Sequence, residues 1–129
     1  MARPSSKHPT ELELEILKIL WRQGETPVSG VRQALAPFRD LAITSVTTIM
    51  NIMVRKGYLA RRKCPGSYVY RPRVGERATA GGMLKDLMER AFDGSAEAVV
   101  AHLLETGDLD ERELHRVRAL LKRPGGGKP

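Results

Sequence analysis

The stretch that decides the fold runs from residue 41 to residue 57 and reads LAITSVTTIMNIMVRKG. Apolar side chains recur in it with the period of one helix face, at Val46, Ile49, Met50 and Met53. The opposite face is polar and carries Thr44, Thr47, Thr48, Asn51 and Arg55. Gly57 follows two basic residues, as is typical of a helix C-terminus. The pattern predicts an amphipathic helix with one buried and one hydrogen-bonding face.

Two β-prone runs, 58–63 and 68–71, follow this helix on either side of Cys64-Pro65-Gly66-Ser67. A Pro-Gly pair between such runs favours a β-hairpin. Residues 41–75 contain seven Lys or Arg and no Asp or Glu, which is an electrostatic footprint for a polyanion. Together with a preceding helix, these elements predict the recognition helix and wing of a winged helix-turn-helix, a mostly α fold of the α+β kind.

The candidate DNA contacts are the polar side chains of this helix and the cations of the hairpin. Hydroxyl and amide groups suit contacts in a DNA groove, whereas a purely structural surface would favour Glu, Lys or Ala. On the helix the candidates are Thr44, Ser45, Thr47, Thr48, Asn51 and Arg55. On the wing, where cations meet phosphates, they are Arg61, Arg62, Lys63 and Arg71. The alternatives are a solvated helix face and an edge strand kept soluble by its charges.

The net charge of +7 is distributed unevenly. Residues 1–75 contain 13 Lys or Arg and 5 Asp or Glu, whereas residues 76–129 contain 9 and 10. This asymmetry indicates a nucleic-acid module joined to a different unit. We expect a flexible arm at 1–9, a winged-helix domain at 10–73, a helical domain at 74–122 and a disordered tail at 123–129.

Further helices are predicted on both sides of the central stretch. Thr10 and Glu13 form a capping-box pattern, and Ser29 is positioned to cap a second helix. Beyond residue 75, three short amphipathic helices cannot bury much apolar surface alone, so we expect a second copy of the chain to cover them. The expected dimerisation residues are Leu84, Leu87, Met88, Val99, Val100, Leu103, Leu104, Leu114, Val117 and Leu121.

Several functional classes are excluded by the pattern of reactive residues. A single cysteine, Cys64, excludes an intrachain disulfide, and the three histidines lack metal-ligand spacing. No nucleophile–base pattern or phosphate loop is present, so we expect neither an enzyme nor a cofactor. Without a membrane span or signal-peptide pattern, the expected location is the cytoplasm. The alternatives to a DNA-binding regulator are a protein–protein adaptor and a redox- or ligand-responsive regulator acting through Cys64 or the inter-domain cleft.

The chain from Thr10 to Lys122 resembles the penicillinase repressor family of bacterial transcription factors, the BlaI/MecI type. The resemblance rests on four stretches, 10–13 with Leu20-Trp21, 44–50 with 55–59, 68–72, and 92–95. It implies a homodimer that represses genes from a dyad-symmetric operator in double-stranded DNA. It also implies major-groove contacts by Thr44, Ser45, Thr47 and Thr48.

The resemblance further implies that a membrane sensor of β-lactams, or a protease, relieves repression by cleaving the chain. His102-Leu103 stands where the family has its Asn-Phe cleavage bond, which is a departure from the pattern. A copper-responsive branch of the family carries Cys-x-Cys motifs near its C-terminus, and this sequence has none.

Overall fold

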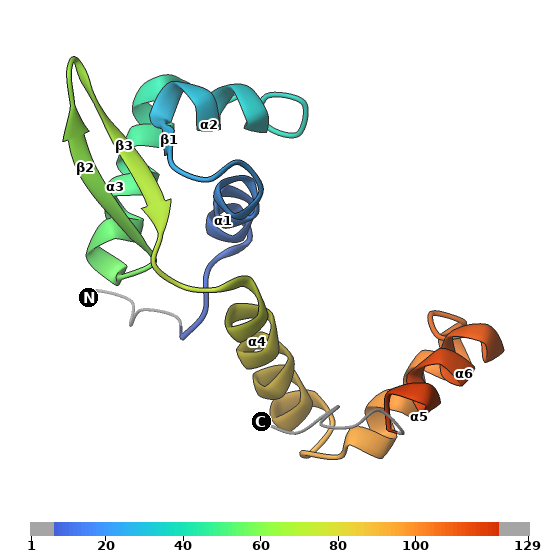
Figure 1. Ribbon diagram of the computed structural model, residues 1–129. Coiled ribbons are helices and arrows are strands. Elements are labelled where there is room, and N and C mark those ends of the chain that lie inside the picture. Colours follow the sequence, from blue (N-terminus) through green and yellow to red (C-terminus); the bar gives the residue numbers. More distant parts are fainter. Residues whose placement is uncertain (1–6, 122–129) are drawn as a thin grey trace. The chain divides into compact units, whose positions relative to one another are not determined.

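The computed structural model describes residues 7–121, so the expected tail and most of the expected N-terminal arm lie outside the described residues. The described residues form two compact units, which divide between Met83 and Leu84. Helices predominate and a small antiparallel sheet accompanies them, which confirms the predicted α+β fold class (Figure 1). In chain order the elements are α1 (Glu11–Gln23), β1 (Thr26–Pro27), α2 (Val28–Leu35), α3 (Ile43–Lys56), β2 (Leu59–Cys64), β3 (Ser67–Pro72), α4 (Glu76–Ala91), α5 (Ala96–Thr106) and α6 (Glu111–Leu120).

Helix α1 begins with the predicted capping box. The Thr10 amide donates to Glu13 Oε1 (2.9 Å), and the Glu13 amide donates to Thr10 Oγ1 (3.2 Å). These two bonds satisfy amides that have no partner inside the helix. Gly24, with φ of 80°, ends the helix in a conformation that L side chains rarely adopt.

The expectation that Ser29 caps the second helix is wrong. Helix α2 begins at Val28, its N-cap is Pro27, and no side chain bonds the first turn. Pro27 also pairs with Val69 as the last residue of β1. The helix therefore starts directly where the strand ends, and Ser29 already lies inside its first turn.

Helix α3 has the predicted buried face. Val46, Met50 and Met53 are fully buried, and Ile49 packs against the same core. Gly57 ends the helix with φ of 88°, in the left-handed region. Its position confirms the predicted helix stop.

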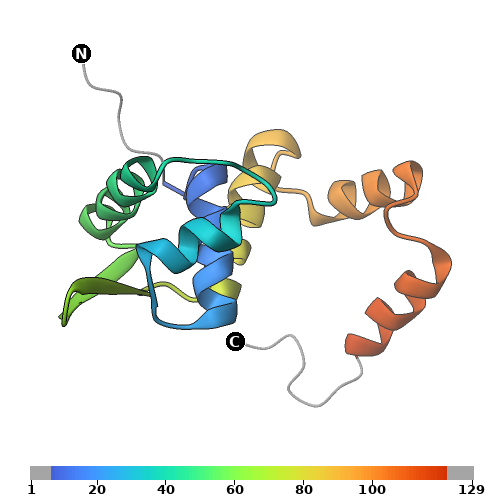
Figure 2. The same cartoon turned by 90° about the horizontal axis from the view of Figure 1, so that it is seen from above.

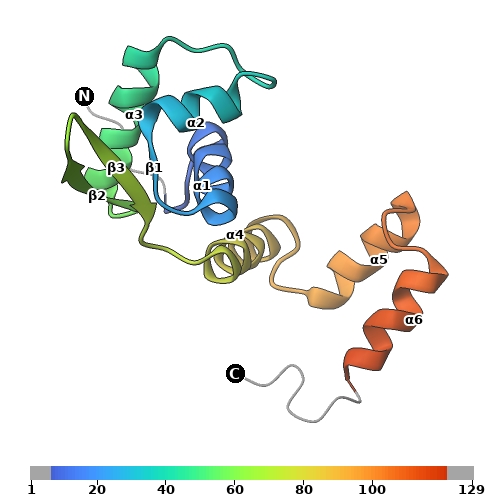
Figure 3. The same ribbon diagram turned by 45° about the horizontal axis from the view of Figure 1, so that its top comes forward.

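The sheet contains a third strand in addition to the predicted hairpin. Strands β2 and β3 are joined at Pro65-Gly66, and β1 pairs with the other edge of β3, giving the order β1-β3-β2. Because the chain reverses at Gly57, β2 runs back along α3. The tip of the hairpin consequently lies at the end of the unit where α3 begins (Figures 1 and 3).

One hydrophobic core holds the first unit together. It joins α1, α2 and α3 to the strands through Ile16, Leu17, Ile19, Leu20, Val31, Leu35, Val46, Met50, Met53, Leu59 and Tyr70. Trp21 is partly buried at the edge of this core. The Trp21 indole donates to the Val74 carbonyl (2.9 Å), which fixes the segment after β3 to α1.

Helices α5 and α6 both begin with a side-chain cap. Ser95 accepts from the Ala98 amide at the start of α5, and Asp110 with Glu113 forms a capping box at the start of α6. A short loop beginning at Gly107 joins α5 to α6 (Figure 2). Among the described residues, none in α4, α5 or α6 is buried. This unit therefore has secondary structure but no core of its own.

Candidate nucleic-acid interface

The predicted hydroxyl face of α3 is accessible. Thr44, Ser45 and Thr48 are exposed, and Thr47 is partly exposed. The Thr47 hydroxyl donates to the Ile43 carbonyl (2.8 Å), and the Thr48 hydroxyl donates to the Thr44 carbonyl (2.9 Å). Because both hydroxyl protons are donated to carbonyls of the same helix, the two threonines offer a partner only a methyl group and an acceptor oxygen. Such a surface suits a thymine methyl or an amino donor on a base edge.

The beginning of α3 has a free positive end. Its N-cap is Ala42, no side chain caps the first turn, and that turn contains no acidic residue. The first amide groups of a helix lack carbonyl partners inside it and favour an anion. Since α1 and α6 carry full capping boxes, the bare end of α3 contrasts with theirs. This end can receive a phosphate of the DNA backbone.

Asn51 connects α3 to the wing. Its Oδ1 accepts a hydrogen bond from the Tyr70 hydroxyl (2.9 Å) and another from Arg61 Nη1 (2.9 Å). Tyr70 is buried, so this bond fixes the inner face of the hairpin against α3. The side-chain oxygen of Asn51 is thus bonded within the protein, and only the side-chain amino group could contact DNA.

The wing cations lie on opposite faces of the hairpin. In the β2–β3 register, Arg61 pairs with Tyr70 and Lys63 with Tyr68, whereas Arg62 pairs with Val69. Paired residues share a face, and neighbours along a strand alternate. Arg61 and Lys63 therefore share the face of buried Tyr70, and the Arg61 guanidinium lies 4.4 Å from the Tyr68 ring centroid. The sequence alone had suggested one basic group at 61–63.

Arg62 is engaged by a carboxylate that the sequence pattern did not connect with the wing. Arg62 Nε donates to Glu25 Oε2 (3.0 Å), and Arg62 Nη2 donates to Glu25 Oε1 (2.8 Å). The bond from Arg62, supported by the charge of Arg71, holds the pKa of Glu25 below its ordinary value despite some desolvation. The same bond raises the pKa of Arg62. The third guanidinium nitrogen, Nη1, lies 3.3 Å from Cys64 Sγ.

A second carboxylate neutralises the end of the recognition helix. Glu13 Oε2 accepts from Lys56 Nζ (2.8 Å), and the Glu13 side chain is only 5% exposed. Burial, and next the charge of Glu13, raise the pKa of neighbouring Tyr58. Of the seven cations in 41–75, Lys56 and Arg62 are thus paired. The others make no ion pair within residues 7–121: Arg55, Arg61, Lys63, Arg71 and Arg73.

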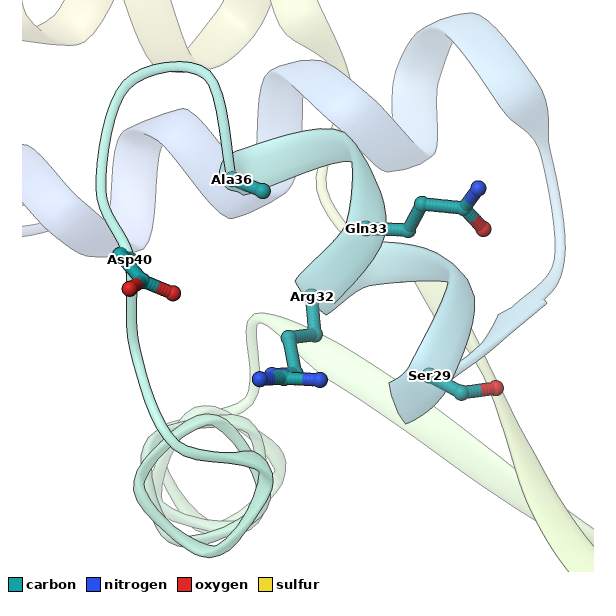
Figure 4. A pocket seen from close by; sticks show the side chains of 5 residues that line it. All are labelled: Ser29, Arg32, Gln33, Ala36 and Asp40. Carbon is teal, nitrogen blue, oxygen red and sulfur yellow. The ribbon is translucent and has the colours of Figure 1, made fainter.

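A shallow pocket at the helix-turn-helix adds residues that the sequence pattern did not single out. It is lined by Ser29, Arg32, Gln33, Ala36 and Asp40, and Figure 4 shows the Arg32 side chain beside the start of α3. Arg32 Nε donates to the Leu41 carbonyl (2.8 Å), which holds the turn in place. The outer face of α2 could have been found from the same helical period that identified its buried Val31 and Leu35.

The described residues offer few features of other functional classes. Within 7–121 no cluster of three His, Cys, Asp or Glu side chains could hold a metal ion. In the same range no helix is long and apolar enough to cross a membrane.

Three helices on a three-stranded sheet, with an accessible polar helix beside a basic hairpin, define a winged helix-turn-helix protein. The model of the penicillinase repressor family matches residues 9–123. The chain belongs to the penicillinase repressor family, which confirms the resemblance found in the sequence.

Two relatives of known class agree with this assignment. The transcriptional regulator BlaI of Mycobacterium tuberculosis is 30% identical over 122 residues, covering 92% of this chain and 88% of that protein. The penicillinase repressor of Bacillus licheniformis is 21% identical over 113 residues, or 88% of each chain. A solved MarR family protein from Bacillus stearothermophilus aligns with a TM-score of 0.48 and 22% identity, over 88% of this chain and 76% of that one. The chain is a transcriptional regulator of the DNA-binding repressor class and not an enzyme.

Proposed function

We propose that the chain is a homodimeric repressor that binds a dyad-symmetric operator in double-stranded DNA. One observation carries the proposal. The uncapped N-terminus of α3 and the tip of the basic hairpin lie toward the same end of the first unit (Figure 1). Each protomer inserts α3 into a major groove and lays its wing along the adjacent backbone.

On the recognition helix, Thr44, Ser45, Thr47 and Thr48 contact base edges or nearby phosphates. Their methyl groups and acceptor oxygens discriminate bases weakly, so the shape of the operator contributes to recognition. Arg55 follows on the same side of α3, and the side-chain oxygen of Asn51 accepts a hydrogen bond from the wing residue Tyr70.

The wing supplies electrostatic affinity. Lys63 and Arg71 are exposed and make no ion pair within residues 7–121, and Arg61 is oriented by Asn51 and Tyr68. Cations in such positions neutralise phosphates without reading sequence. Arg32 on α2, which the sequence did not single out, supplies a further positive group beside the turn.

Dimerisation follows from the exposed apolar faces of the second unit. Leu84 is 56% exposed and Leu121 is 84% exposed, and Leu87, Val100, Leu104 and Val117 are also exposed. Met88, Val99, Leu103 and Leu114 are only partly buried. A second copy of the same helices covers these faces and gives them the core that one protomer lacks. The two-fold axis of this dimer matches the symmetry of a dyad-symmetric operator. The proposed location of the repressor is the cytoplasm.

Relief of repression by a membrane sensor or a protease remains a prediction for this chain. His102 and Leu103, which occupy the family's cleavage position, lie inside α5. A protease needs an open segment, so cleavage there requires local unfolding of α5. The lack of buried residues in α5 supports such opening.

The test is a footprint of the purified chain on the DNA that flanks its own gene, repeated over a salt series. We expect one protected dyad of about two helical turns, with protection lost steeply as salt rises. Diffuse binding without a protected site would reject the repressor and favour the adaptor. Loss of protection on treatment with a thiol reagent, absent in Cys64→Ser, would instead favour the redox-responsive alternative.

A further inference from the structure

We infer that Glu25 is a positioning residue for the wing, that it acts through Arg62, and that Arg62 consequently orients the wing instead of binding a phosphate. The inference rests on the proposed DNA binding and assigns roles within that interface. It concerns one acidic residue outside the basic stretch and one cation within it.

The sheet places the two side chains on the same outer face. Thr26 pairs with Tyr70, and both are buried on the inner face. Glu25 precedes Thr26 and so faces outward, as Arg62 does opposite Val69. Because the strand order is β1-β3-β2, the ion pair reaches over β3 and joins the two edges of the sheet.

Each of the three guanidinium nitrogens of Arg62 has a partner within the protein. Nε and Nη2 make a fork-like pair with both carboxylate oxygens of Glu25, and Nη1 lies at hydrogen-bond distance from Cys64 Sγ. A phosphate could bind the Nε–Nη2 edge of this guanidinium only by displacing the carboxylate. Arg62 therefore differs from Lys63 and Arg71, which make no ion pair within residues 7–121.

In addition to the β1–β3 pairing and the buried Leu59 and Tyr70, two side-chain connections on opposite faces orient the wing. On the inner face, Asn51 accepts hydrogen bonds from Tyr70 and Arg61 and fixes the hairpin to α3. On the outer face, Glu25 fixes it to the segment between α1 and β1. Without the outer connection, the part of the hairpin beyond the β1–β3 pairing can change its twist, and the tip then moves relative to the DNA backbone. The pair is solvent-exposed, with Arg62 62% and Glu25 30% accessible, so its main effect is on geometry.

If Glu25 instead competes with DNA for Arg62, the expected effect of its neutralisation on DNA affinity has the opposite sign. If Arg62 exchanges the carboxylate for a phosphate on binding, Glu25 competes with DNA, and its neutralisation strengthens binding. If Glu25 positions the wing, its neutralisation weakens binding although the protein becomes more positive. The sign of the effect separates the two roles.

The experiment measures affinities of full-length variants for a duplex of about 30 base pairs, long enough for two half-sites, and for unselected duplex of equal length. The first duplex is selected from a random library with the wild-type chain. The variants are Glu25→Gln, Arg62→Glu and the charge swap Glu25→Arg with Arg62→Glu. The control Glu11→Gln makes the same charge change at a side chain 87% exposed on α1.

We expect Glu25→Gln to weaken binding roughly threefold to fivefold relative to Glu11→Gln, as suits loss of an exposed pair. Its salt dependence should be no steeper than that of the wild type, since displacement of the wing can only remove phosphate contacts. Arg62→Glu should weaken binding further, and the charge swap should restore it to within about twofold by rebuilding the pair.

Stronger or unchanged binding by Glu25→Gln would overturn the inference, as would a swap no better than Arg62→Glu. If Arg62→Glu does not fold, the sign for Glu25→Gln decides alone. Failure of the wild-type chain to bind either duplex would instead reject the proposed function. The two failures are therefore distinguishable.

Discussion

Replacement of Lys63 and Arg71 by alanine should reduce the salt dependence of DNA binding by a calculable amount. Both are exposed wing cations without an ion pair in residues 7–121, so both can replace counterions on the DNA backbone. A dimer loses four such cations, two from each protomer. At about 0.9 per phosphate contact, the slope of log K against log salt should decrease in magnitude by about 3.6.

The corresponding effect on affinity is large enough to measure easily. Between about 50 and 200 mM salt the wild type should lose affinity about 150-fold more than the double variant. Fluorescence anisotropy with a labelled duplex gives both slopes. The matched control is Lys18→Ala with Arg22→Ala, which removes two exposed cations from α1 and should leave the slope unchanged. Equal slopes for the wild type and the wing variant would refute phosphate contact by the wing.

Three further predictions concern recognition, assembly and pH. Thr48→Ala should change the preference among duplexes more than the overall affinity, as a competition selection would reveal; equal weakening for all sequences would make Thr48 a phosphate contact. Leu104→Asp should convert the dimer to a monomer by placing a charge in the interface, which sedimentation equilibrium would detect, and an unchanged dimer would place the interface elsewhere. In an NMR titration, the pKa of Glu25 should lie below its ordinary value and return toward it in Arg62→Ala. Because that pKa is lowered by folding, the pair should stabilise the protein at neutral pH and stop doing so as pH falls through the folded-state value.

Local patterns accounted for most of the helices and for the hairpin. The capping boxes at Thr10 and Asp110 and the stop at Gly57 involve residues within a few positions of each other, so adjacent side chains and backbone decide them. Helical period likewise identified Val46, Met50 and Met53 as buried. The one misplaced cap, Ser29, failed because a distant strand fixes where α2 begins.

The polar face of α3 could be predicted from the sequence for the same local reason. Which cations form ion pairs within the protein could not. Glu13 and Glu25 precede the basic stretch and reach it only after α1 packs on α3 and β1 pairs with β3. Composition alone could not distinguish among the seven cations of residues 41–75. The sheet register then separated Arg61 from Arg62, and folding neutralised Lys56 and Arg62. Charges far apart along the chain interact strongly only at short range, so tertiary structure alone decides which cations remain available to DNA.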